Sequence, residues 1–220
     1  DTYSGIEGLA GSAYADTLYG SDFDEALRGN GGNDQLFGSG GADTLDGGTG
    51  IDTADYSGSD AGIAIDLAVG STSGGFAEGD ALSGIEQIIG SAFADQLTGT
   101  AGDQTLVGGA GDDVLAGRGG ADALQGGDGF DTADYSASAG GIALTLDGSV
   151  GIGADAAGDR ITEIERIIGS AYDDAISGVG AAETIEGGGG DDVVSGGGGD
   201  DNLIGGIGSD QIDGGAGTDR

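Results

Sequence analysis

The chain has 220 residues, of which 55 are glycine, and its 40 acidic residues against five arginines give a formal charge of −35. This charge excludes tracking of nucleic-acid phosphates and offers no basic surface to acidic lipid. Histidine, cysteine and lysine are absent, which excludes a zinc protease site, a histidine-based triad, a thiolate and a P-loop. We therefore expect no enzyme activity, and no apolar run approaches the roughly 18 residues of a membrane span.

Three similar blocks occur along the chain, at residues 11–55, 90–134 and 169–220, and each has a nine-residue period. The first block reads GSAYADTLY, GSDFDEALR, GNGGNDQLF, GSGGADTLD, GGTGIDTAD. Position 6 of the nonamer is aspartate in most copies, and position 8 is nearly always leucine, isoleucine or valine. The glycines gather at positions 1, 2 and 4. Repeats in constant phase indicate a solenoid in which each repeat is one small structural unit.

One large apolar residue in nine is too sparse for an amphipathic helix or an ordinary alternating strand. The spacing predicts a three-residue strand whose central residue points inward, followed by a six-residue glycine turn. Two nonamers then form one flattened coil of 18 residues, so we expect an all-β fold, a right-handed parallel β-roll. The predicted core is the set of position-8 side chains: Leu18, Leu27, Leu36, Leu45, Leu97, Leu106, Leu115, Leu124, Ile176, Ile185, Val194, Leu203 and Ile212.

The turns carry the chemistry of a calcium site. Ca²⁺ takes six to eight hard oxygens, which aspartate carboxylates and the free carbonyls of glycine turns supply. Glycine also permits the positive φ angles that such tight turns need. A chain with so much negative charge and so little apolar surface needs a bound cation to offset its self-repulsion on folding.

These nonamers resemble the repeats-in-toxin (RTX) family of calcium-binding proteins, whose consensus is GGxGxDxUx with a large aliphatic residue at U. The resemblance implies that each ion lies between turns on the same side and is shared by the aspartates of repeats n and n+2, with loop carbonyls completing the shell. The best pairs are Asp34 with Asp52, Asp113 with Asp131, Asp192 with Asp210, and Asp201 with Asp219. The implied ligands also include Asp43, Asp122, Glu25, Glu183 and the turn glycines Gly32, Gly50, Gly111, Gly129, Gly190, Gly199 and Gly208.

The first two nonamers of each block depart from the consensus. In the first, an aromatic residue (Tyr14, Phe93 or Tyr172) replaces glycine at position 4, so Asp16, Asp95 and Asp174 are poor candidate ligands. We expect these aromatic side chains to plug the ends of the blocks. In the second, Glu25, Gln104 or Glu183 stands at position 6. Gln104 brings no charge, so we expect a weak or missing ion beside Asp122, and roughly six to nine ions in all.

The spacers, residues 56–89 and 135–168, each contain an alternating run and an IExII segment. The next nonamer follows IExII without a linker, so we expect wider solenoid coils that join the blocks into one continuous array over residues 1–220. Independent two-stranded flaps are the alternative. Ala54 and Ala133, each followed two residues later by tyrosine, indicate that the cross-section of the roll changes at the fifth nonamer.

The function that these patterns favour is a calcium-dependent structural module of a larger secreted protein. Both ends of the sequence look cut, and the RTX resemblance implies type I secretion, folding on extracellular Ca²⁺, and flanking domains as partners. The alternative is a carbohydrate-binding or processivity module similar to the R-modules of mannuronan epimerases, with a polysaccharide or cell-surface contact. An ice-binding solenoid is rejected because loop positions 3 and 5 carry no regular ladder of threonine and asparagine.

Overall fold

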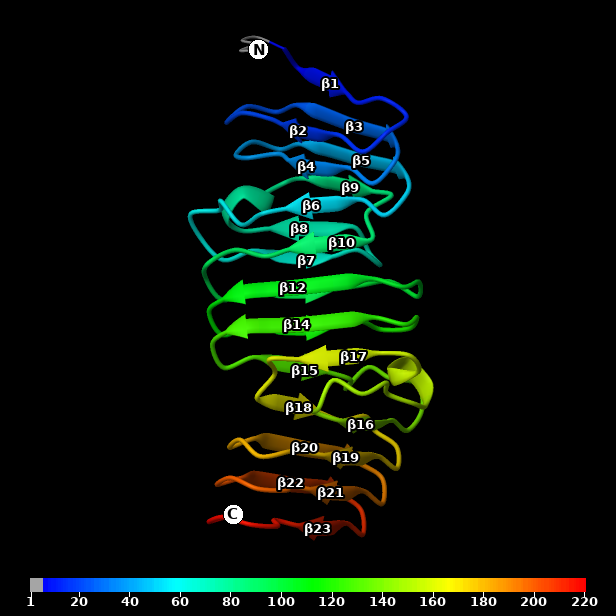
Figure 1. Ribbon diagram of the computed structural model, residues 1–220, viewed down its shortest axis with the longest axis vertical. Coiled ribbons are helices and arrows are strands. Elements are labelled where there is room, and N and C mark those ends of the chain that lie inside the picture. The colour runs from blue at the N-terminus through cyan, green and yellow to red at the C-terminus, as the bar shows by residue number, and fades with distance from the viewer. Residues whose placement is uncertain (1–5) are drawn as a thin grey trace.

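The computed structural model describes residues 6–220, which form an elongated stack of short strands with β1 (Gly8–Ala10) at one end and β23 (Gln211–Asp213) at the other (Figure 1). Almost every pairing is parallel, and the only helices among these residues are two single turns, η1 (Gly75–Ala77) and η2 (Ala154–Ala156). The predicted all-β parallel roll is confirmed.

The strands form two faces, each made of two sheets in succession. The first face contains a seven-stranded sheet of β2 (Thr17–Tyr19), β4 (Gln35–Phe37), β6 (Thr53–Asp55), β10 (Gln87–Ile89), β12 (Thr105–Ala110), β14 (Ala123–Asp128) and β17 (Arg160–Thr162), then a four-stranded sheet of β16 (Ala143–Thr145), β19 (Ala175–Ser177), β21 (Val193–Ser195) and β23 (Gln211–Asp213). The second contains a four-stranded sheet of β1 (Gly8–Ala10), β3 (Ala26–Gly31), β5 (Thr44–Thr49) and β9 (Ala81–Ser83), then an eight-stranded sheet of β8 (Ser71–Ser73), β7 (Ala64–Asp66), β11 (Gln96–Thr98), β13 (Val114–Ala116), β15 (Thr132–Asp134), β18 (Arg166–Ile168), β20 (Thr184–Gly189) and β22 (Asn202–Ile207).

Within a block the register repeats every 18 residues, as the sequence predicts. Leu18 lies opposite Leu36, and Leu27 lies opposite Leu45. Successive nonamers therefore alternate between the two faces, and each apolar residue stacks on the corresponding residue of the next coil.

The predicted core is confirmed except at its two ends. Leu27, Leu36, Leu45, Leu97, Leu106, Leu115, Leu124, Ile176, Ile185 and Val194 are at most 1% exposed. Leu18 is only partly buried and Ile212 is 50% exposed, because each lies in an end coil with a neighbour on one side only. Burial of each such side chain contributes about 1.5–3 kcal/mol.

Each spacer is built into the stack through strands that pair with both flanking blocks. In the first spacer, β9 pairs with β5, β10 pairs with both β6 and β12, and β7 pairs with β11. The chain passes β6, runs ahead to β7, turns back through the antiparallel β8 and η1, and fills the gap beside β5 with β9 (Figure 1). The second spacer repeats this path, with an antiparallel bridge between Ala143 and Ile152 in place of β8.

This path exchanges the faces of the roll between blocks. The antiparallel return leaves β7 and β9 on the same face, so the alternation of nonamers shifts by one. The fifth nonamer of block one (β6) is therefore continued through β10 by the second nonamer of block two (β12). Odd-numbered nonamers of one block therefore lie on the same face of the roll as even-numbered nonamers of the next.

The prediction that aromatic residues at position 4 plug the blocks is wrong. Tyr14, Phe93 and Tyr172 are 79%, 47% and 50% exposed. The neighbouring coil packs against their backbone, as Gly32 packs on the backbone of Tyr14, so their side chains point away from the roll. The buried aromatic residues are instead Tyr56 and Tyr135, which follow the small Ala54 and Ala133 at the predicted change of cross-section.

Candidate metal centre

Acidic side chains at position 6 form a ladder along each edge of the roll. One carboxylate oxygen of each accepts a hydrogen bond from the backbone N–H of the position-6 residue one coil earlier. The distance is 2.7 Å from Asp34 N to Asp52 Oδ1, and 2.8 Å from Asp113 N to Asp131 Oδ1. The pairs Asp192–Asp210 and Asp201–Asp219 have the same contact at 3.1 Å. The structure thus brings together the four pairs singled out from the sequence, in 18-residue register.

The second carboxylate oxygen in these ladders has no partner. Nine such atoms are buried without a hydrogen bond among the described residues: Oδ2 of Asp34, Asp43, Asp52, Asp113, Asp122, Asp131, Asp192 and Asp201, and Oε2 of Glu183. All nine residues are among the candidate ligands predicted from the sequence. A buried carboxylate oxygen without a donor is costly unless a cation compensates it.

Backbone carbonyls face the same spaces. A side chain built at Gly29 would collide with Asp34 Oδ2 and with the carbonyl oxygen of Gly47 in the next coil. At Gly187 the corresponding atoms are Asp192 Oδ2 and the carbonyl oxygen of Gly205. Glycine at position 1 thus leaves room for two oxygens that repel each other when nothing lies between them. No three acidic side chains converge anywhere in residues 6–220, so a cation here needs main-chain oxygens as well.

Backbone carbonyl oxygens of the neighbouring coil also lie close to the glycines predicted at position 4. All seven have positive φ, between 110° and 159°. At Gly208 the space that a side chain would fill is taken by the carbonyl oxygen of Gly190 and approached by Asp191 Oδ1. The position-5 side chains form an exposed ladder of their own, in which Asp191 Oδ1 accepts from Ser209 N at 2.9 Å.

The position-6 carboxylate of the first nonamer of each block accepts hydrogen bonds from a serine four residues earlier. Ser91 donates through its N–H (2.6 Å) and its hydroxyl (2.8 Å) to Asp95, and Ser170 does the same for Asp174. Ser12 has this role at Asp16, and Ser21 donates to Glu25. Asp16, Asp95 and Asp174, which are poor candidate ligands from the sequence, therefore have a protein donor, and so does the candidate Glu25.

Sequence reasoning missed four acidic residues that continue the ladders into the spacers. Asp80 and Asp159 accept from the N–H groups of Asp43 and Asp122, and Glu86 and Glu165 accept from those of Asp52 and Asp131. Each is followed by the x-U-x strand pattern of the nonamer, as in Asp80-Ala-Leu-Ser, and that was the available signal.

Tyrosine hydroxyls satisfy the remaining oxygens of two of these residues. Tyr56 donates to Asp80 Oδ2 at 2.7 Å and Tyr135 donates to Asp159 Oδ2 at 2.8 Å. Burial and the adjacent carboxylate raise the pKa of both tyrosines, so each phenol keeps the proton that it donates.

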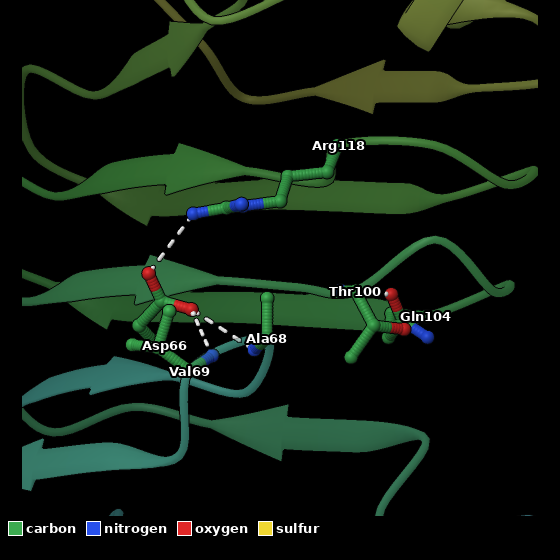
Figure 2. A network of polar contacts seen from close by, with 6 residues as sticks. All are labelled: Asp66, Ala68, Val69, Thr100, Gln104 and Arg118. Atoms are coloured by element: carbon green, nitrogen blue, oxygen red, sulfur yellow. Dashed lines mark hydrogen bonds and ion pairs between the residues drawn. The ribbon is translucent and has the colours of Figure 1, made fainter.

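Positive charge is scarce around these carboxylates, and in residues 6–220 only two arginines form ion pairs. Figure 2 shows Arg118, in the loop after β13, reaching past the intervening strand to Asp66 at the end of β7, with 3.0 Å between Nη2 and Oδ2. Asp66 also accepts from the N–H groups of Ala68 and Val69. The pair links the first spacer to block two, and its exposure limits its contribution to about 1 kcal/mol or less.

The family model for the RTX calcium-binding nonapeptide repeat (4 copies) matches residues 2–22, 19–54, 80–103, 98–133, 162–194, 177–212 and 186–220, which is well over half of the chain. The chain belongs to the RTX calcium-binding repeat family. It is accordingly a calcium-binding repeat module, of a family whose repeats have a structural and not a catalytic role and whose proteins are typically secreted. Among curated proteins, none matches this chain. No helix in residues 6–220 is long and apolar enough to cross a membrane.

Three of the RTX carboxylates bind protons more tightly than an ordinary aspartate does. Burial raises the pKa of Asp43, Asp113 and Asp122 to about 7, from an ordinary 3.8. Neighbouring acidic groups raise these pKa values further, and backbone hydrogen bonds partly oppose the rise. Protonation removes the repulsion between a buried carboxylate and the carbonyl oxygen that faces it.

Acid should therefore replace calcium in part. Because the folded-state pKa is raised, the folded form binds more protons than the unfolded chain, and this stabilisation is lost as pH rises through about 7. In chelator, we expect far-ultraviolet circular dichroism to show more β-structure at about pH 5 than at about pH 8. Calcium affinity should fall on acidification from about pH 8 to about pH 5, since protons and Ca²⁺ compete for the carboxylates. β-Structure that is constant or decreases on acidification would contradict this assignment.

Proposed function

We propose that the chain is a calcium-dependent structural module in which Ca²⁺ ions between successive loops hold the coils of the roll together. The observation that carries the proposal is the set of nine buried carboxylate oxygens without a partner, all at predicted ligand positions. A hard cation with oxygen ligands supplies the positive charge that these sites lack. No catalytic role is proposed for this segment.

The residues that would hold the ions are the position-6 acids in same-edge pairs, with glycine carbonyls of the adjoining loops. The best-supported pairs are Asp34–Asp52, Asp113–Asp131, Asp192–Asp210 and Asp201–Asp219. In each pair the earlier aspartate has a buried oxygen without a partner. Glu183 joins Asp201 in the same way, because its Oε2 is also unpartnered. We expect roughly six to nine ions in total.

Gln104 lies where this pattern lacks a charge. The side-chain Oε1 of Gln104 accepts from the backbone N–H of Thr100 at 2.8 Å. The backbone N–H of Gln104 donates to Asp122 Oδ1 at 2.7 Å. Figure 2 shows the side chains of Thr100 and Gln104 together. The carbonyl oxygen of Gly117 faces the amide as it would face a carboxylate. This gap therefore has the geometry of a site without its second anionic ligand.

The experiment is a calorimetric count of bound Ca²⁺ for the native chain and for Gln104→Asp. We expect roughly six to nine ions for the native chain. The variant should bind one more ion or tighten the weakest site. The control is Gln96→Asp, which adds the same charge to the outward face of β11, in the same block but outside the loops. A native chain that binds no calcium overturns the proposal, and equal binding by Gln104→Asp and Gln96→Asp overturns the same-edge pairing rule.

We further propose that residues 1–220 act as one folding unit within a larger secreted protein. Export through a type I channel suits a chain that is unfolded at low calcium and folds in the millimolar Ca²⁺ outside the cell. The pairing of spacer strands with both neighbouring blocks supports a single unit. Flanking domains of the parent protein are the partners that this role requires.

Contact with a polysaccharide is the second candidate function, and one surface feature favours it. Tyr19 is 63% exposed on the outer face of β2 and stacks on Phe37 of β4, with ring centroids 4.5 Å apart. An exposed tyrosine ring stacked on a partly buried phenylalanine, beside the polar side chains of Thr17 and Gln35, offers an apolar surface suited to a sugar ring. Titration with alginate in excess calcium distinguishes this function from a purely structural one.

A further inference from the structure

The loops that lead from each spacer into the next block differ from the nonamer turns. Between β9 and β10 the loop is residues 84–86, and between β17 and β18 it is residues 163–165. The inward residues on either side, such as Leu82 and Ile88, are six positions apart, where those of successive nonamers are nine apart, and each loop ends in glutamate. Ile85 and Ile164, at the centre of these loops, are buried in the core.

These loops nevertheless reproduce the aspartate ladder of the nonamers. Glu86 Oε2 accepts from Asp52 N at 3.0 Å, and Glu165 Oε2 accepts from Asp131 N at 2.9 Å. In the nonamers this contact joins residues 18 positions apart, whereas here it joins residues 34 apart. The same geometry occurs at both ends of block two, in loops that share their last two residues, isoleucine and glutamate.

The aspartates at these junctions carry oxygens that nothing else satisfies. Asp52 and Asp131 are both 0% exposed, and Oδ2 of each is buried without a partner. These atoms face the spacer loop. The position that a side chain at Gly47 would take lies 2.8 Å from Asp52 Oδ2 and against the carbonyl oxygen of Gly84. At Gly126 the atoms are Asp131 Oδ2, at 2.5 Å, and the carbonyl oxygen of Glu163.

We propose that each junction is a further calcium site, one formed by Asp52, Glu86 and the carbonyl of Gly84, the other by Asp131, Glu165 and the carbonyl of Glu163. The inference rests on the proposed calcium-binding function and extends it beyond the nonamer pairs. At each junction the buried Oδ2 has no proton donor and lies near a loop carbonyl, and the glutamate is bonded to the N–H of the same aspartate, so a cation held there would compensate the buried charge. Irregular oxygen donors from a short loop suit Ca²⁺ better than Mg²⁺, which demands near-ideal octahedral geometry.

Such ions would tie each repeat block to the spacer that follows it. The ladder of Asp16, Asp34 and Asp52 would then continue without interruption through Glu86 towards block two. The ladder of Asp95, Asp113 and Asp131 would continue through Glu165 towards block three. Calcium would in this way link the blocks to one another as well as the coils within a block.

The test is the calorimetric count of bound Ca²⁺ for the double variant Glu86→Gln/Glu165→Gln. Glutamine keeps an oxygen that can accept from the Asp52 and Asp131 N–H groups, so only the charge is lost. We expect two fewer ions per chain, or two sites weakened roughly tenfold or more, since calcium affinity depends on the number of charged ligands. The control is Asp60→Asn/Glu78→Gln, which removes the same charge from exposed positions outside the ladders and should leave the count unchanged.

The outcomes separate this inference from the proposed function. A native chain that binds no calcium overturns the proposed function. A native chain that binds calcium, with a double variant that binds the same number of ions with the same affinities, overturns the junction sites alone. Circular dichroism in saturating Ca²⁺ shows whether the double variant folds. If it does not, the single variants are counted, each with one fewer ion expected and an unchanged count contradicting the inference.

Discussion

In chelator near neutral pH, the chain will show the circular dichroism of a largely unfolded polypeptide, and millimolar Ca²⁺ will convert it to β-structure. Each nonamer buries one aliphatic side chain, which contributes about 1.5–3 kcal/mol. Ordering the backbone of a single residue costs about 1–2 kcal/mol, so the apolar layer alone cannot hold nine residues in place. The charge of −35 and the nine unpartnered carboxylate oxygens oppose folding further. Calcium binding must supply the difference, so its free energy is folding free energy.

Magnesium is the control for this experiment. Mg²⁺ carries the same charge, but it dehydrates reluctantly and demands a tight octahedral shell, so it should leave the chain unfolded at the same concentration. Equal β-content in chelator and in Ca²⁺ would show that the roll is stable without metal. Equal folding in Mg²⁺ would show that charge neutralisation suffices and that the loops are not shaped for calcium.

Val194→Asp should prevent calcium-induced folding of the last coils. Val194 lies in β21, is 1% exposed, and stacks between Ile176 and Ile212 in the apolar layer. A carboxylate there is buried without a partner, which typically costs about 3–5 kcal/mol. The strand contributes only one side chain to the core, so no second inward residue of β21 can compensate. We expect loss of calcium-induced β-structure in block three, measured as a smaller circular dichroism change and fewer bound ions.

Val193→Asp is the matched control, because it makes the same substitution one position earlier in the same strand. Val193 is 48% exposed and lies beside Ala175 and Gln211 on the outer surface. Its replacement should change stability by less than about 1 kcal/mol. Equal effects of the two substitutions would mean that the inward and outward positions of the strands are assigned wrongly.

The repeat itself could be predicted from the sequence because it is local. A nine-residue period with one aliphatic position determines which side chains point inward, and glycine at position 4 marks the turns that need positive φ. Leu36 and Leu115 in the core, and Asp34 above Asp52, follow directly from this period. The ligand types follow from the chemistry of aspartate and calcium.

Tertiary structure alone decided how the blocks are joined. The antiparallel return between β7 and β9 depends on which sheet edge is free after β6, and no local pattern in the spacer encodes that. It exchanges the faces of the roll, and it brings Glu86 to Asp52 and Glu165 to Asp131 across 34 residues, outside the 18-residue rule.

The same distinction explains the exposed aromatics and the satisfied carboxylates. An aromatic residue in place of glycine predicts a local change, but the side chain of Tyr14 points outward because the next coil lies against its backbone. Asp43 and Asp80 both precede an x-U-x strand, yet Oδ2 of Asp80 accepts from Tyr56, 24 residues away, whereas Oδ2 of Asp43 has no partner. A periodic sequence therefore determines the repeating unit and its chemistry, whereas contacts between distant segments determine which carboxylates remain free for calcium.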